Sequence, residues 1–277
     1  MRIAICNETF GDMPLEQAVE MAVSLGYTGW EVAPFMLGSD ANAITSEQRR
    51  RYRQIVRAAG LEIVGLHWLL AKTEGHHLTT ADAATRARTS RYFEDLIRLC
   101  GDLCEDGPGG VMVLGSPQQR NRSDEITTAM AIENAADVLG GLGDTLEKHD
   151  VRIALEPLGP QEGNFLNTAD EARSLRERLT SPRFGLHLDV KAMSSEPEDI
   201  PTIIRKHADW LLHFHANDPN RRGPGMGDVD FIPIIAALRE VGYQGWLSVE
   251  VFDYEPGPQR LAGESIATLQ RALAETA

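Results

Sequence analysis

The sequence predicts an α/β protein, a single (β/α)8 barrel, on three observations. Short apolar or β-branched runs alternate with longer amphipathic stretches, which is the pattern of βαβ units around a parallel sheet. Eight such units follow one another along the chain. The length of 277 residues, 42% of them hydrophobic, suits one barrel, so we expect one domain over residues 1–277.

The runs that predict the eight strands are, in order, Arg2–Cys6, Gly29–Ala33, Leu61–His67, Gly110–Gly115, Arg152–Glu156, Phe184–Asp189, Trp210–His215 and Trp246–Val251. Helices are expected between them. Several helix starts offer a capping oxygen with acidic residues in the first turn, namely Ser46-Glu47, Thr79–Asp82, Ser123-Asp124 and Thr168–Glu171.

One junction occurs twice in the sequence. Leu25–Val32 and Val241–Ser248 share the order Gly-Tyr, one variable residue, Gly-Trp. Each predicts a helix end, a tight turn and a new strand, with Gly26 and Gly242 in the left-handed conformation that ends a helix at low cost. The longest stretch without periodicity, Ala216–Gly227, is expected to be a functional loop after the seventh strand.

Composition excludes several classes of protein. The formal charge of −14 repels phosphate backbones and anionic lipid surfaces, so nucleic acid and membranes are not expected partners. The apolar run at the N-terminus is too short for a signal peptide or a membrane span, which predicts a cytoplasmic protein. The three cysteines, an odd number, are interpreted as reduced structural thiols.

The predicted strand ends carry the residues with the most chemistry. In a closed parallel barrel these ends meet on one face. Glu156, Asp189, His215 and Glu250 end or nearly end four consecutive strands, and they are 33, 26 and 35 residues apart, about one βα unit each. A single acid at a strand end is more often a cap or an ion-pair partner, but four in step predict one shared metal ion.

Three carboxylates and one imidazole form an oxygen-dominated ligand set. Such a set favours Mn²⁺, with Mg²⁺, Co²⁺ or Zn²⁺ as alternatives. Strand alternation places His187 and His213 one layer deeper, where we interpret them as groups that support the ligands, although direct ligation by either stays open. His67 and Trp68, at the end of the third strand, are predicted to line a pocket.

Three sequence stretches resemble one known family. They are Leu155–Leu158 with Glu162 and Asn164–Thr168, then His213–Arg221 with Gly223–Gly227 and Asp230-Phe231, and finally Ser248–Phe252 together with Leu188-Asp189. These stretches are similar to the xylose isomerase-like TIM barrels of the sugar phosphate isomerase/epimerase superfamily, and among them to the D-tagatose and D-psicose 3-epimerases.

The resemblance implies roles for particular residues. Glu156, Asp189, His215 and Glu250 would bind the metal, and Glu156 and Glu250 would also be the catalytic acid/base pair. Glu162 and Arg221 would contact the substrate. The sequence departs from the family pattern in two places. Ala192 stands where a histidine is usual, and Asn217-Asp218 replaces Gly-Glu. In addition, Lys191 introduces a cation near the metal.

The activity that follows is a metal-dependent isomerase or epimerase acting on a small keto-sugar or sugar derivative. The ion would stabilise an enediolate while the two glutamates move a proton. Sequence leaves epimerisation, aldose–ketose isomerisation and elimination open, the last making a dehydratase or lyase on an inosose or keto-glycoside. Whether the substrate is phosphorylated also stays open.

Two alternatives come from other classes. An apurinic endonuclease of the endonuclease IV type shares the barrel, but it resembles a three-zinc site with additional histidines and a DNA-binding surface, neither of which this sequence offers. A non-catalytic sugar-binding barrel is the other alternative, and the intact acid pair argues against it. Relatives often form homo-oligomers, so a dimer or tetramer is possible.

Overall fold

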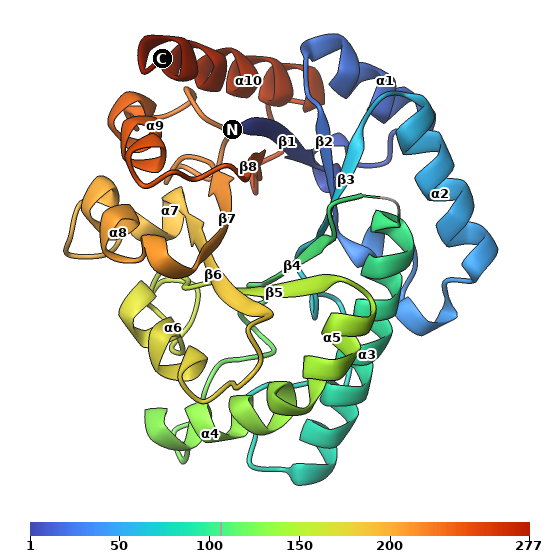
Figure 1. The fold of residues 1–277 in the computed structure, drawn as a ribbon, viewed down its shortest axis with the longest axis vertical. Coiled ribbons are helices and arrows are strands. Elements are labelled where there is room, and N and C mark those ends of the chain that lie inside the picture. Colours follow the sequence, from blue (N-terminus) through green and yellow to red (C-terminus); the bar gives the residue numbers. More distant parts are fainter. Residues whose placement is uncertain (106) are drawn as a thin grey trace.

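The computed structural model describes residues 1–105 and 107–277, and in it eight parallel strands close into one barrel in sequence order. Figure 1 shows the strands as an inner ring with the helices outside it. The strands are β1 (Arg2–Cys6), β2 (Gly29–Val32), β3 (Glu62–Leu66), β4 (Gly110–Leu114), β5 (Val151–Leu155), β6 (Phe184–Asp189), β7 (Leu211–Ala216) and β8 (Trp246–Val249). The predicted fold class is confirmed.

All eight predicted strands are present, and their ends lie within two residues of the predicted ones. The predicted β5 and β8 are too long at their C-terminal ends, because β5 ends at Leu155 and β8 at Val249, so Glu156 and Glu250 directly follow their strands. Trp210 lies in a 3-10 turn and not in β7, which begins at Leu211.

The helices that cover the barrel are α1 (Leu15–Leu25), α2 (Ser46–Ala58), α3 (Ala83–Cys104), α4 (Thr128–Leu139), α5 (Gly143–Lys148), α6 (Ala169–Arg176), α7 (Val190–Met193), α8 (Ile200–Lys206), α9 (Phe231–Glu240) and α10 (Pro258–Glu275). Short 3-10 helices lie at Asn7–Phe10, Pro34–Met36, Ala41–Ala43, Gly140–Leu142 and Ala208–Trp210. Helix α10 packs beside α1, so the last helix completes the outer ring. In the described part of the chain, no helix is both long and apolar enough to cross a membrane.

Side-chain caps explain where several helices begin. Asp82 and Thr168 cap α3 and α6, as predicted. For α2 the cap is Thr45, one residue before the predicted start, and it forms a capping box with Gln48. The predicted start at Ser123-Asp124 is wrong, because α4 begins at Thr128 and Thr127 supplies its cap.

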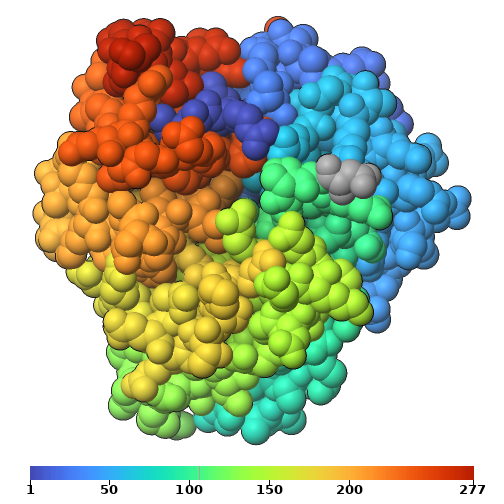
Figure 2. Space-filling view, in the orientation of Figure 1, coloured from blue at the N-terminus to red at the C-terminus, as the bar shows by residue number. Residues whose placement is uncertain are grey.

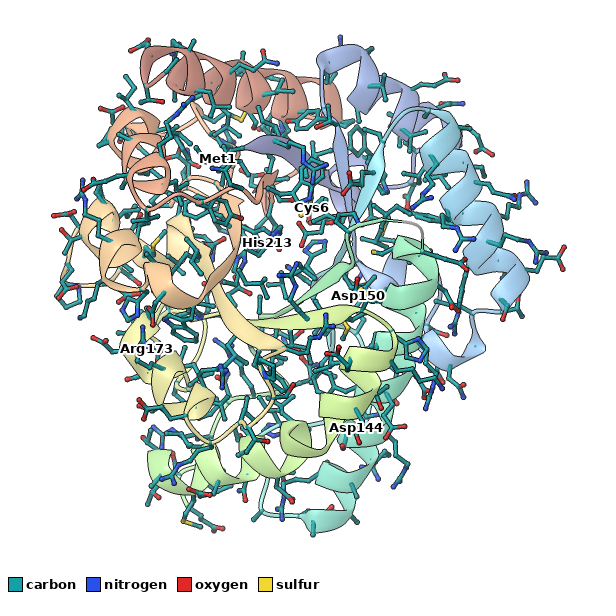
Figure 3. The ribbon with its side chains drawn as sticks, in the orientation of Figure 1. Met1, Cys6, Asp144, Asp150, Arg173 and His213 are labelled. Atoms are coloured by element: carbon teal, nitrogen blue, oxygen red, sulfur yellow. The ribbon has the colours of Figure 1, made fainter. Side chains whose placement is uncertain are left out.

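The repeated junction is used as predicted at the ends of α1 and α9. Gly26 has φ 102° and Gly242 has φ 72°, both in the left-handed region. Figure 2 shows successive segments following one another around the face in sequence order. In Figure 3, Cys6 and His213 lie toward the middle of the ring, whereas Asp144 and Arg173 lie on its outside. The interior of the ring is therefore where polar strand residues meet.

Candidate active site

The four predicted ligands meet at the C-terminal ends of β5 to β8, and all four are buried. Glu156, Asp189 and His215, together with His187, each place one possible ligand atom within 4.8 Å of those of the other three. Glu250 Oε2 lies 2.9 Å from His215 Nδ1. The residues predicted from strand spacing thus form one cluster.

Glycine at the end of β4 makes room for Glu156. A Cβ atom built on Gly115 would lie 1.4 Å from Glu156 Oε2, far inside van der Waals contact. Any side chain at position 115 would therefore displace this carboxylate. The neighbouring strand is shaped to accept the carboxylate.

His67 and Trp68, which directly follow β3, and His215 of β7 hold the Glu250 carboxylate. Trp68 Nε1 donates to Glu250 Oε1 at 2.6 Å, and His67 Nδ1 approaches the same oxygen at 3.1 Å. Burial alone would raise the pKa of Glu250, but the charge and hydrogen bond of His215 and the hydrogen bond of His67 hold that pKa well below its usual range. On its other side, His67 Nε2 lies 3.0 Å from Glu8 Oε2.

A second buried carboxylate holds two imidazoles at once. His213 Nε2 lies 3.0 Å from Glu31 Oε2, and His215 Nε2 lies 3.1 Å from Glu31 Oε1. A carboxylate accepts hydrogen bonds, so both imidazoles donate from Nε2, while Nδ1 of His215 faces Glu250 Oε2. Sequence reasoning assigned Glu31 no role. The sequence does carry a signal for such a role, because Glu31 is an acid inside an otherwise apolar strand.

His187 has an unusual environment. It pairs in register with His213 of β7, one layer below the pair Asp189 and His215, as predicted. Its ring is fully buried, and neither nitrogen has a hydrogen-bond partner among the described residues. Its Nε2 lies 3.8 Å from Glu156 Oε1. Burial lowers the pKa of His187, which keeps the imidazole neutral beside the cluster.

The electrostatics of the cluster favour a cation. Burial raises the pKa of Glu156 well above its usual value, and the charges of Glu250 and Asp189 raise it further. Buried carboxylates this close repel one another unless a positive charge lies among them. With one imidazole nitrogen and several oxygens converging, the residues fit a divalent metal ion.

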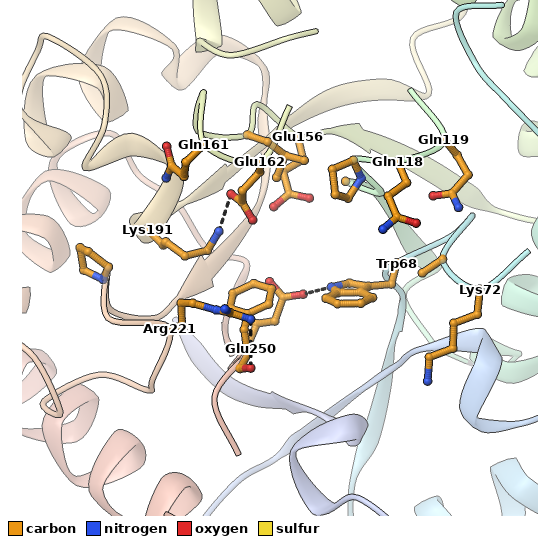
Figure 4. A pocket seen from close by; sticks show the side chains of 16 residues that line it. Trp68, Lys72, Gln118, Gln119, Glu156, Gln161, Glu162, Lys191, Arg221 and Glu250 are labelled. Atoms are coloured by element: carbon orange, nitrogen blue, oxygen red, sulfur yellow. Dashed lines mark hydrogen bonds and ion pairs between the residues drawn. The ribbon is translucent and has the colours of Figure 1, made fainter. Parts of the chain in front are cut away.

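Above the cluster lies a cavity of about 520 Å³, lined among others by Glu156, Glu162, Arg221, Glu250 and Trp68. Figure 4 shows these side chains arranged around the open space. His67, predicted to line a pocket, lies behind Glu250 and does not reach the cavity wall. Trp68 and Arg221 have positive φ values of 54° and 71°, a costly backbone conformation that is often found at functional sites.

Arg120 is a further residue that sequence reasoning missed. Its guanidinium is buried, has no ion pair with a carboxylate among residues 1–105 and 107–277, and donates to the carbonyls of Leu114, Glu156 and Leu166. Burial lowers the pKa of Arg120 to about 10. These bonds tie the ends of β4 and β5 to the following loop, so Arg120 fixes the backbone that carries Glu156.

A closed parallel barrel with acids and imidazoles at its strand ends, open to a cavity, defines a (β/α)8 barrel of the enzyme type. The xylose isomerase-like TIM barrel family matches residues 19–272, and the chain belongs to this family. The resemblance predicted from the sequence is confirmed.

Curated relatives and solved structures agree. D-psicose 3-epimerase of Enterocloster bolteae is 28% identical over 215 residues, which cover 77% of this chain and 69% of the relative. D-psicose 3-epimerase of Agrobacterium fabrum is 26% identical, covering 84% of this chain and 78% of the relative. The crystal structure of D-psicose 3-epimerase with D-tagatose from Clostridium cellulolyticum H10 has a TM-score of 0.84 at 19% identity, covering 100% of this chain and 99% of that one. The predicted enzyme class, a sugar isomerase or epimerase, is confirmed by the curated relatives.

Proposed function

We propose that this chain is a divalent-metal-dependent epimerase of a small keto-sugar or sugar derivative. One observation carries the proposal. Glu156 and Glu250, which come from strands on different sides of the cluster, reach the same cavity from facing walls. Two carboxylates placed in this way can remove a proton from one face of a carbon and return it to the other.

The metal would be held by Glu156, Asp189, His215 and Glu250. Bound there, a divalent ion would supply Lewis-acid polarisation of a carbonyl and an adjacent hydroxyl. Mn²⁺ is our first choice, because hard oxygen ligands outnumber nitrogen and no thiolate is among the proposed ligands.

The other residues position the acid/base pair and the substrate. Trp68 and His67 fix the Glu250 carboxylate by donating to one oxygen, so His67 acts through Glu250 instead of touching the substrate. Arg221 presents a planar set of donors that suits adjacent sugar oxygens. Glu162, on the same wall as Glu156, accepts hydrogen bonds from hydroxyls.

Deuterium exchange tests the proposal. The Mn²⁺-loaded protein is incubated in D₂O with D-psicose, D-tagatose or L-ribulose, and deuterium in the recovered sugar is measured by mass spectrometry. We expect Glu156→Gln and Glu250→Gln to lose nearly all incorporation while keeping the wild-type fold. The exposed Glu240→Gln is the matched control. Full exchange in both active-site variants would refute the two-carboxylate mechanism.

Metal content separates the alternatives. One ion per chain supports the epimerase, whereas three zinc ions with cleavage of abasic DNA would favour the nuclease. Sedimentation would test the possible homo-oligomer.

A further inference from the structure

Lys191 is a buried lysine that opens onto the reaction cavity. It lies in the first turn of α7, two residues after Asp189, and is only 6% exposed. Lysine is almost never buried to this extent without a partner. Lys191 Nζ lies 2.5 Å from Glu162 Oε2 and 4.5 Å from the centre of the Phe252 ring.

The backbone of Lys191 is tied to a metal-ligand candidate through Asn217. Lys191 N donates to Asn217 Oδ1 at 2.8 Å, and Asn217 Nδ2 donates to Asp189 Oδ2 at 2.5 Å. Asp189 Oδ1 in turn accepts from Ala192 N at 2.8 Å. Ala192 and Asn217, two of the positions that depart from the family pattern, therefore belong to one hydrogen-bonded unit with Lys191 and Asp189.

The side chain of Lys191 brings a positive charge to the wall of the cavity that the two glutamates also line. Glu156, Glu250, Arg221 and Lys191 all line the same cavity. Figure 4 shows Lys191 joined to Glu162 on the wall beside Glu156. An ammonium has three donors, and Glu162 takes one, which leaves capacity for a substrate oxygen.

We propose that the Lys191 ammonium contacts the substrate and stabilises the oxygen on which negative charge develops as the proton leaves carbon. The proposal rests on the proposed function, since it assumes an enediolate in this cavity. Hydrogen bonds from a charged donor to a charged oxygen are stronger than those to a neutral oxygen, so Lys191 would bind the charged species better than the neutral ketose.

The experiment compares a charged probe with a neutral one. Acetohydroxamate presents two adjacent oxygens, and its anion imitates the charge of an enediolate. Its Kd and that of D-psicose are measured by calorimetry on Mn²⁺-loaded wild type, Lys191→Met, Lys191→Arg and the exposed control Lys206→Met. We expect Lys191→Met to weaken hydroxamate binding about ten- to hundredfold and D-psicose binding less than about threefold. Lys191→Arg should keep most of the hydroxamate affinity, and Lys206→Met all of it.

Other outcomes overturn the proposal at different levels. Equal weakening of both probes in Lys191→Met would give Lys191 a purely structural role, and unchanged binding of both would remove it from the site. If Lys191→Met does not fold, Lys191→Arg decides instead. An equal loss of affinity for hydroxamate and for D-psicose in Lys191→Arg would also give Lys191 a purely structural role. Failure of the wild type to bind hydroxamate with Mn²⁺ present would instead refute the proposed metal site itself.

Discussion

Replacing Glu31 by glutamine tests whether β2 orients His215, the proposed metal ligand on β7. Glu31 is 1% exposed and uses both oxygens, one for His213 and one for His215, at 3.0 and 3.1 Å. Glutamine has nearly the same shape but only one acceptor oxygen. One imidazole would then face an N–H donor and would have to move its proton from Nε2 to Nδ1.

The effect of Glu31→Gln on Mn²⁺ affinity and on stability depends on which imidazole loses its acceptor. If it is His215, Nδ1 carries a proton and cannot bind metal. If it is His213, a buried donor loses its partner at a cost of about 1–3 kcal/mol. Loss of an outer partner of a metal-bound histidine weakens metal binding about 10- to 100-fold, which corresponds to about 1.4–2.7 kcal/mol. We expect Glu31→Gln to fall within this range.

The assay is a Mn²⁺ titration in which free ion is followed by electron paramagnetic resonance, with Glu240→Gln as the exposed control. Circular dichroism of the metal-free proteins checks that the fold is retained. A Mn²⁺ Kd within twofold of wild type, in a folded Glu31→Gln protein, would refute the reasoning.

Two further predictions concern other features. Gly115→Ala should reduce deuterium exchange about a hundredfold, because the added Cβ displaces Glu156. The control Gly140→Ala should leave exchange unchanged, because its Cβ meets open space. Equal exchange rates in the two variants would contradict the packing argument. Burial raises the pKa of Glu196 to about 7. Between about pH 4.5 and 7 the native protein therefore keeps a proton on Glu196 that the unfolded chain has released. The folded state loses stability as pH rises through this range, because above it the buried carboxylate must be charged. Glu196→Gln should therefore raise the Tm on the order of 2 °C at pH 8 and not at pH 4 by calorimetry, and an equal shift at both pH values would disprove it.

Local signals explain how much of the barrel was predictable. Strand alternation and the glycines at positions 26 and 242 act over a few residues, so the sequence alone located every strand to within one or two positions. The start of α4 was mispredicted because Ser123 and Thr127 both offer a capping oxygen. Only the packed structure selects between two caps of similar strength.

The sequence by itself determined which side chains would stand at the strand ends, because their spacing follows the βα repeat. Only the tertiary structure decided which of them meet. Glu31 and His213 are 182 residues apart, and the Lys191 backbone is held by Asn217, which directly follows β7. Such contacts arise when the barrel closes and sets the register of one strand against another, and no pattern within a single segment encodes that register.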